Sequence, residues 1–423
     1  MIKKRIIYQV LVRAWKDGRF SCWDDSAFRY LGTLGITDIW FTGIPRHASG
    51  RDFVKGNLGS PYAVSDWYDV NPYLADNPET RMDEFESLVR RCHKAGFRVI
   101  TDFIPNHVAC DYSDRFGGIP VCDHCDYDWT DTRKIDYSHP EALAAMTRIA
   151  QFWASKGVDG LRCDMVEMVS PDILASIIAS VRRDYPEFCF IGEAYDRANY
   201  ERYISAGFDL LYDKTGLYDS LRAICCNGES AERITWNWQN LGLLQASMLN
   251  FLENHDERRL ASSGFLGDAR KSFAALAVSA LFGPASFMIY GGQECGENAE
   301  DGNDGRTSIF DGTRIKSLDN PDASVLEKYR TLMKTASSPL CMDGSNYDLC
   351  YCNVGAPGFD RTRHFAFLRH LAGRTAVCLC NFSGNPASVD ILIPEDAARS
   401  FNTECRCVHL EAGPYDYIFS ELK

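Results

Sequence analysis

The sequence predicts an α/β protein, a (β/α)8 TIM barrel with a short insertion after its third strand and a C-terminal all-β domain. Two observations predict the barrel: short apolar runs alternate with longer runs of helical period, and this alternation supplies eight strands by residue 290. A third observation predicts the second domain, because apolar runs after about Ser338 follow one another without helices between them. A chain of 423 residues is long enough for one large domain and a smaller one.

The first three strands follow from this alternation. We expect strands at Ile6 to Val12 and Thr37 to Thr42, on either side of a helix near Ser26 to Leu34. A second helix, Met82 to Ala95, leads into the third strand, Phe97 to Phe103. A glycine follows each helix, which is typical of a helix C-terminus.

Five further strands complete the barrel, with helices between them. The strands are expected in the run that ends at Asp164 and at Phe188 to Glu193, Phe208 to Tyr212, Ser247 to Leu252 and Ala285 to Tyr290. The helices are expected at Glu141 to Lys156, Asp172 to Asp184, Asn199 to Ala206, in a longer stretch through Asn240, and at Ala269 to Leu281. We therefore assign residues 1–104 and 141–337 to the barrel.

Residues 105–140 do not fit the repeat, since they are rich in Asp, Gly, Cys and aromatic residues and show no helical period. We interpret them as a short excursion over the mouth of the barrel. Beyond the barrel, the runs His364 to Arg369, Thr375 to Phe382 and Ser388 to Ile393 alternate or are β-branched. They favour a C-terminal β-sandwich domain over residues 338–423.

Charge and cysteine content exclude several classes of partner and location. A net charge of −13 argues against nucleic acid and against anionic membrane surfaces, and no apolar run approaches the roughly 20 residues of a membrane-spanning helix. The apolar segment after Met1 is too short for a signal peptide. The 17 cysteines are an odd number. Many are adjacent or two residues apart, and cysteines so spaced are poor disulfide partners for one another. We therefore expect free thiols and a cytoplasmic location.

The stretch Val158 to Met168 carries the first chemical signal. Its apolar run ends in Arg162 and Asp164, two residues apart, so both side chains lie on the same face of the expected strand. An α/β barrel builds its active site at that end of its strands. These residues alone leave a buried structural ion pair as an equal alternative.

Three other strand ends also carry acids. Strand three ends in Asp102, strand five in Glu193, and strand seven runs into Glu253 and Asp256. Four acidic strand ends on one rim would be costly if they were only structural. Clustered acids whose environments separate their pKa values are typical of acid/base chemistry, which favours an active site here.

These four stretches resemble the four signature regions of the α-amylase family of retaining glycoside hydrolases. The stretches Pro61 to Tyr62 and Tyr290 to Glu294 resemble its flanking motifs, so that the resemblance covers roughly residues 5 to 335. It implies the barrel and the appended β domain, and an enzyme that acts on α-glucans. Four motifs in the right order on the right strands are specific as a set.

The resemblance implies that Asp164 is the nucleophile, Glu193 the general acid/base and Asp256 the carboxylate that stabilises the transition state. A retaining glycosidase needs one ionised carboxylate and one carboxylic acid about 5 Å apart. We expect Arg162 to hold Asp164 ionised. No cationic residue is adjacent to Glu193 in sequence, so we expect nothing local to oppose a raised pKa of its carboxyl group.

The resemblance also implies a binding set. His107 and His255 match histidines that hydrogen-bond sugar hydroxyls, and Tyr62 matches an aromatic platform under the sugar; with Arg162 they are the expected substrate-binding residues. Asp102 and Asn106 match residues that order the site. Where this chain has Glu167-Met168, many family members carry Lys-His, which leaves the leaving-group subsites open.

We therefore expect retaining hydrolysis of α-1,4-glucosidic bonds in maltodextrins, starch or glycogen through a covalent glycosyl-enzyme intermediate, with no cofactor required for the chemistry. Endo action is favoured because the excursion is short, and Trp67, Tyr68 and Trp129 in mouth loops either stack on glucose units or pack against the barrel. The alternatives are an exo-acting α-glucosidase, in which Glu167 restricts the leaving-group side, and a 4-α-glucanotransferase. A catalytically inactive binding subunit is less favoured.

Metal binding stays open at this stage. Asn106 is a candidate calcium ligand by resemblance, and Asp111, Asp114, Asp123, Asp126 and Asp128 of the excursion offer oxygen ligands, although a solvated acidic loop would offer them too. The cluster Cys110, Cys122, His124 and Cys125 favours free thiols over a zinc site. The acidic run Asp301 to Arg306 lacks the pattern of a calcium loop and is expected on the rim of the cleft.

Overall fold

Eight parallel strands form a closed barrel in the computed structural model, which describes residues 3–299 and 305–422. This confirms the predicted fold class. In order around the barrel the strands are β1 (Ile6–Leu11), β2 (Asp38–Thr42), β5 (Arg98–Phe103), β8 (Gly160–Cys163), β9 (Cys189–Gly192), β10 (Leu210–Tyr212), β11 (Met248–Phe251) and β12 (Ser286–Tyr290). The run Asp301 to Arg306, expected on the rim, lies mostly outside the described residues.

By their internal contacts the described residues form two compact units. The first contains residues 7–212 and 306–318, and the second contains residues 3–6, 213–299, 305 and 319–422. The first unit includes β2, β5, β8, β9 and β10, whereas β11, β12 and the C-terminal strands belong to the second.

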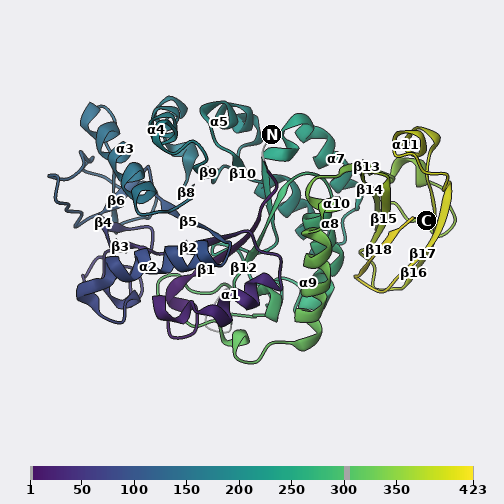
Figure 1. Cartoon of the computed structure of the whole chain (residues 1–423), viewed down its shortest axis with the longest axis horizontal. Helices are drawn as coiled ribbons and strands as arrows, with labels where there is room; N and C mark the ends of the chain where they lie inside the picture. Colours follow the sequence, from purple (N-terminus) through teal and green to yellow (C-terminus); the bar gives the residue numbers. More distant parts are fainter. Residues whose placement is uncertain (1–2, 300–304, 423) are drawn as a thin grey trace. The chain divides into compact units, whose positions relative to one another are not determined.

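Helices of the first unit alternate with its strands, as Figure 1 shows along the sequence colours. Two of them begin at a capping side chain: Asp24 accepts hydrogen bonds from the backbone amides of Ser26 and Ala27, and Ser170 accepts one from the amide of Asp172. Each buries one apolar stripe. These helices are α1 (Asp25–Gly32), α2 (Arg81–Lys94), α3 (Pro140–Ser155), α4 (Pro171–Asp184) and α5 (Tyr200–Ala206).

The second unit continues the same pattern. Its helices are α6 (Asp219–Asn227), α7 (Glu232–Leu241), α8 (Phe273–Leu281), α9 (Ala323–Ala336) and α10 (Pro339–Met342). Seven of the last eight residues of α8 are apolar and all eight are buried, so this helix is enclosed by its neighbours on every side. No helix among the described residues is long and apolar enough to cross a membrane.

Two short antiparallel pairs interrupt the first unit. Between β2 and α2, the strands β3 (Pro45–His47) and β4 (Val64–Val70) pair with each other, and within the expected excursion β6 (His107–Ala109) pairs with β7 (Thr132–Lys134). None of residues 105–139 is helical, and the β6–β7 pair lies among them. The β3–β4 pair was not predicted.

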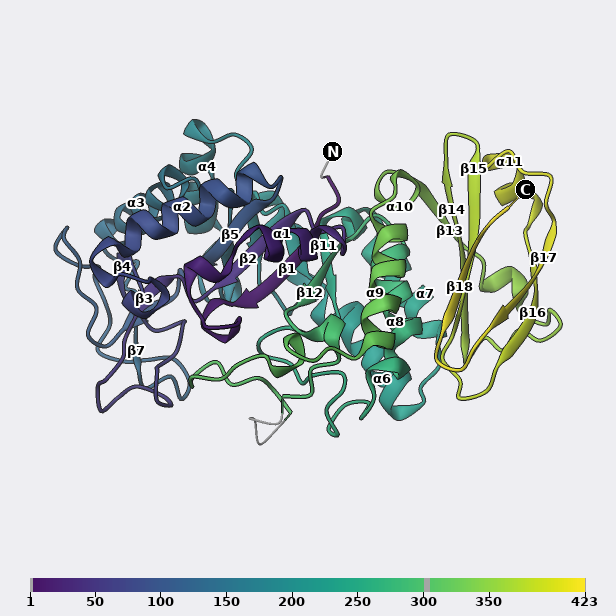
Figure 2. The ribbon, with the colours of Figure 1, turned by 60° about the horizontal axis from the view of Figure 1, so that its bottom comes forward.

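The C-terminal strands form two antiparallel sheets, drawn in yellow-green in Figure 2. One contains β13 (Ser345–Asp348), β14 (His364–Leu371), β15 (Arg374–Asn381) and β18 (Tyr417–Glu421), and the other β16 (Ala387–Leu392) and β17 (Cys407–Ala412). Ala372 and Gly373 join β14 to β15 with positive φ at both positions, as a tight hairpin turn requires. One short helix, α11 (Glu395–Ser400), lies among these strands in the sequence.

Candidate active site

Asp164 and Glu193 directly follow two neighbouring strands of the first unit. Cys163 at the end of β8 is in register with Gly192 at the end of β9, so the two acids emerge at the same level. The hydrogen bonding between β8 and β9 continues for one residue beyond the strands, because the amide of Glu193 donates to the carbonyl of Cys163 at 3.0 Å. A side chain at Gly192 would bring its Cβ within 2.8 Å of Leu211, which explains the glycine before the acid.

Arg162 joins the two acids. It is fully buried, with Nη1 2.6 Å from Asp164 Oδ1 and Nη2 2.7 Å from Glu193 Oε2. Its pKa lies well above the ordinary value: burial lowers it, but the charge of Glu193 and the oxygens of Tyr212, Tyr62 and Asp164 more than offset the burial. The alternative of a simple pair between Arg162 and Asp164 is therefore replaced by a three-membered cluster.

Three aromatic rings surround this guanidinium group. Its central carbon lies 5.3 Å from the ring centroid of Trp40, 5.4 Å from that of Tyr62 and 5.5 Å from that of Tyr212. Nε also donates a hydrogen bond to the Tyr212 hydroxyl at 3.2 Å. Because ring faces attract cations, these side chains fix the position of Arg162 in a dry environment.

The expectation that nothing local opposes a raised pKa of Glu193 is wrong. Arg162 reaches this carboxylate from the adjacent strand, which adjacency in sequence does not reveal. The backbone amide of Met165 donates to Oε2 at 2.9 Å, and the hydroxyl of Tyr195 lies 2.5 Å from Oε1. Each of these contacts favours the ionised form of Glu193.

The turn after Asp164 folds around Glu193. Met165 adopts the left-handed conformation, with φ 41° and ψ 52°, which costs a non-glycine residue about 1–3 kcal/mol. In return its amide contacts the side chain of Glu193, and the amide of Val166 donates to the backbone carbonyl of Glu193 at 3.1 Å. The turn that follows Asp164, with its strained residue Met165, is thus hydrogen-bonded to both the side chain and the backbone of Glu193.

Glu167 links the same turn to the loop after β9. Its Oε2 accepts the amide of Tyr195 at 3.0 Å and its Oε1 accepts the amide of Asp196 at 2.9 Å. Glu167 was considered in the sequence as a residue that restricts the leaving-group side. In the structure its carboxylate orders a loop.

Asp102 contacts two of the aromatic residues of the cluster. Its carboxylate accepts hydrogen bonds from Trp40 Nε1 at 3.1 Å and from the amide of Gly43 at 3.3 Å, and the Tyr62 hydroxyl approaches at 3.5 Å. It therefore fixes two of the rings around Arg162. These contacts agree with the predicted ordering role of Asp102.

His107, at the start of β6, is a buried neutral imidazole. Burial lowers its pKa to about 4, although the nearby Asp131 and Asp126 raise it. A neutral ring can donate through one nitrogen and accept through the other, as a contact with sugar hydroxyls requires. The ring of Trp129 lies 5.1 Å from it.

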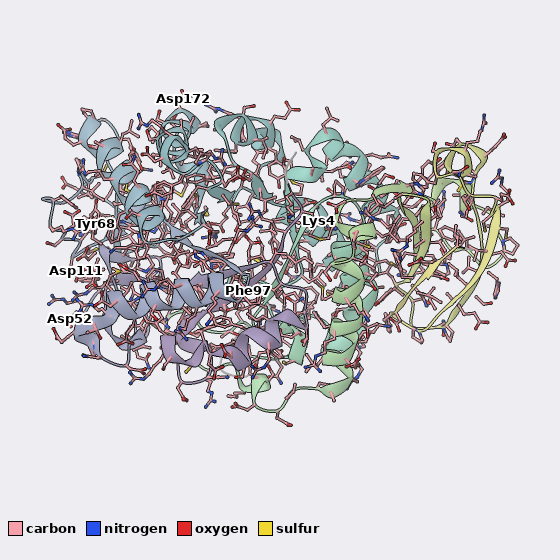
Figure 3. The ribbon with its side chains drawn as sticks, viewed as in Figure 1. Lys4, Asp52, Tyr68, Phe97, Asp111 and Asp172 are labelled. Carbon is pink, nitrogen blue, oxygen red and sulfur yellow. The ribbon has the colours of Figure 1, made fainter. Side chains whose placement is uncertain are left out.

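Two of the three aromatic residues considered for stacking on glucose belong to the core. Trp67 is 0% exposed and packs against Phe103, and Tyr68, labelled in Figure 3, packs against Phe116 and Phe152. The packing alternative thus applies to both. Trp129 is partly exposed beside His107 and stays a candidate.

In the second unit, Asp256 and His255 lie on the loop after β11. His255 Nε2 is 3.1 Å from Asp256 Oδ2, and the side chain of Asp256 is 40% exposed. A buried ion pair anchors this loop: Arg259 Nη1 lies 2.8 Å from Glu253 Oε2. Burial raises the pKa of Glu253 to about 7 even though Arg259 lowers it, so Glu253 is a loop anchor with a costly charge.

The family model described as the alpha amylase catalytic domain matches residues 25–118 and 124–334, well over half of the chain. The chain belongs to the alpha-amylase family. It is 28% identical over 430 residues to "Alpha-amylase MalA" of Haloarcula japonica, covering 95% of this chain and 58% of that relative. It is 24% identical over 345 residues to "Alpha-amylase 3" of Dictyoglomus thermophilum, covering 70% of this chain and 64% of that relative.

A solved structure of an alpha-amylase from Geobacillus thermoleovorans, complexed with acarbose, has the same fold. The TM-score is 0.77 at 17% identity, over 99% of this chain and 98% of that one. The chain thus spans about three fifths of the length of the two curated relatives but almost the whole of this alpha-amylase-family structure.

Calcium, which the alpha-amylase family implies, fits the residues present poorly. Asn106 directs its side-chain nitrogen at Asp126 Oδ2, 2.9 Å away, and Lys134 Nζ contacts Asp126 Oδ1 at 3.0 Å. An ammonium group therefore already neutralises this carboxylate. Within residues 3–299 and 305–422, no group of three or more His, Cys, Asp or Glu side chains is placed to hold a metal ion. The cluster of Cys110, Cys122, His124 and Cys125 forms no such group either. Asn106, the candidate calcium ligand by resemblance, donates to Asp126 in this structure, and removal of metal tests its role.

Lys134 gives this point a test. We expect dialysis against EDTA to leave the Tm unchanged within about 1 °C, and Lys134→Met to lower it by no more than about 1 °C, because a partly exposed ion pair contributes at most about 1 kcal/mol. Differential scanning calorimetry measures both, with Lys156→Met, which breaks a pair with Glu86, as a matched control. A marked fall in Tm with EDTA that added calcium reverses would show that a metal site exists after all.

Sequence reasoning missed Tyr195, Tyr212, Trp40 and Lys134. For Tyr195 a signal was available, since it stands two residues after Glu193 and such a spacing at a strand end can place two side chains on one face. For the others no local pattern exists, because each reaches its partner from a separate element.

Proposed function

We propose that this chain hydrolyses α-1,4-glucosidic bonds with retention of configuration. The observation that carries the proposal is the pair of buried carboxylates, Asp164 and Glu193, that share one guanidinium group. Sharing one cation keeps the two carboxyl groups close together. The double-displacement mechanism requires this, because it needs two carboxyl groups about 5 Å apart. The role of each acid follows the family resemblance.

In the first step Asp164 attacks the anomeric carbon while Glu193 gives its proton to the departing glycosidic oxygen, so that an ester forms and the glycosidic bond breaks. In the second step Glu193 takes a proton from water, the hydroxide oxygen bonds to the anomeric carbon, and Asp164 leaves as the carboxylate. Asp256 is assigned, on resemblance, to stabilising the positive charge that develops on the sugar. Neither step calls on a cofactor.

Arg162 couples the two steps. Before attack, the negative charge of Asp164 shares this cation with Glu193 and favours a proton on Glu193. Once Asp164 is esterified its charge is lost, and the whole field of Arg162 acts on Glu193. The ionised form, which is the base that the second step needs, is then favoured.

The substrates we propose are maltodextrins, starch or glycogen, cut internally. The names of the relatives support α-glucans, and the short excursion between β5 and α3 supports an open cleft. Exo-acting α-glucosidase and 4-α-glucanotransferase activities are the alternatives, since a sugar hydroxyl can resolve the same intermediate as water. The odd number and close spacing of the 17 cysteines support a cytoplasmic location.

One product analysis tests this function. With maltoheptaose blocked at its non-reducing end, we expect internal cleavage, and proton NMR should show the α-anomer among the first reducing sugars. The β-anomer appearing first would refute retention and the role of Asp164. Cleavage of the unblocked sugar alone would refute endo action and favour the exo alternative, and products longer than the substrate would favour transfer.

A further inference from the structure

We propose that Tyr195 is a positioning residue that lets Glu193 hold a proton in one step and release it in the next, and that Glu167 fixes Tyr195 in place for this purpose. This inference rests on the proposed function, because it concerns the same acid/base. It assigns new roles to Tyr195 and to Glu167, a position at which this chain departs from the family pattern.

The two oxygens of Glu193 have different surroundings. Oε2 receives the guanidinium of Arg162 at 2.7 Å and the amide of Met165 at 2.9 Å. Oε1 lies 2.5 Å from the hydroxyl of Tyr195. Since Oε2 already faces the positive charge of Arg162 and accepts the amide of Met165, a proton on Glu193 is accommodated better on Oε1.

The groups around Glu193 differ in what they can do with that proton. A guanidinium and a backbone amide can only donate hydrogen bonds, so Arg162 and Met165 support the ionised form alone. The hydroxyl of Tyr195 can donate to the carboxylate, or rotate and accept from the carboxylic acid. Tyr195 therefore remains a hydrogen-bond partner of Glu193 both as a carboxylate and as a carboxylic acid. A general acid/base must pass through both of these states.

Glu167 holds Tyr195 by its backbone. Both carboxylate oxygens accept amides of consecutive residues, Tyr195 and Asp196, at 3.0 and 2.9 Å. Glu167 itself belongs to the turn that follows Asp164 and that also supplies the amide of Met165. One turn thus contacts Glu193 directly through Met165 and indirectly, through Glu167, by way of Tyr195.

The test measures the titration of Glu193 directly. The protein is labelled with carbon-13 glutamate, and the Glu193 carboxyl resonance is assigned by its loss in Glu193→Gln. In Tyr195→Phe we expect the pKa of Glu193 to rise by about half to one unit, because a donated hydrogen bond stabilises a carboxylate more than an accepted one stabilises the acid. Tyr185→Phe, which removes a hydroxyl at the end of α4, is the matched control and should leave the value unchanged.

Glu167→Gln should shift the same resonance in the same direction by a smaller amount, since only one amide keeps its acceptor. The double variant should shift no further than Tyr195→Phe alone, because both changes act through one hydroxyl. The alkaline limb of the kcat/KM profile should move with the NMR value. A merely structural role would lower the rate and leave both titrations where they are.

An unchanged titration in Tyr195→Phe overturns the role of Tyr195, and an additive double variant overturns the role of Glu167. A shifted titration in a protein without glycosidase activity would instead refute the proposed function and leave the hydrogen-bond coupling established. The NMR readout thus separates the two failures.

Discussion

Asp164→Asn should abolish turnover with glucans and with activated aryl glycosides alike, by a factor on the order of ten thousand or more. An amide is too weak a nucleophile to form the ester, and no better leaving group on the substrate compensates for that. Initial rates with maltoheptaose and with a dinitrophenyl α-glycoside measure the effect. Asp172→Asn, a change of the same chemistry at an exposed position in the first turn of α4, should leave both rates unchanged.

The same variant leaves Arg162 with Glu193 as its remaining carboxylate partner of the cluster. Because removing one member of a buried charged cluster is destabilising, Tm should be measured beside the rate. A folded Asp164→Asn protein that keeps substantial activity on the activated substrate would show that another residue is the nucleophile.

Glu193→Gln should lose glucan hydrolysis by about a hundred- to ten-thousandfold but keep the first step with a dinitrophenyl glycoside, whose leaving group needs no proton. Rapid mixing should therefore show a burst of phenolate followed by slow turnover, because no base activates water in the second step. Azide, which needs no base, should restore the slow phase as the glycosyl azide forms. The exposed Glu187→Gln is the matched control.

The two variants together decide the division of labour. If both lost the burst equally, Glu193 would be required for formation of the intermediate in a way that proton transfer does not explain. The roles of the two acids would then have to be reassigned.

The barrel was predictable because its strands are buried. All four residues of β9 are buried, and such strands read as continuous apolar runs between helices of clear period. β18 and β13 escaped prediction for the opposite reason: most of their residues are partly exposed, so that neither alternation nor an apolar run marks them. The β3–β4 pair is short and irregular in register, which local pattern cannot reveal.

The acids of the site could be predicted from the sequence, but the groups that contact them could not. Strand ends locate Asp164 and Glu193 because parallel strands share one rim. Whether an acid is opposed by a cation depends on which side chain reaches across from the next strand, as Arg162 does. Lys134 and Asn106 likewise meet at Asp126 only through folding of the excursion, so the calcium question needed the structure.

The clamp formed by Glu167 bears on how this chain could be re-engineered. Lysine, common at this position in the family, would remove the acceptor of two backbone amides and set a positive charge against them. A single swap intended to transplant another member's substrate preference would therefore also disturb Tyr195 and, through it, Glu193. Positions 167, 195 and 196 should behave as one epistatic unit, so that libraries which vary them jointly will find active variants that one-at-a-time mutagenesis discards.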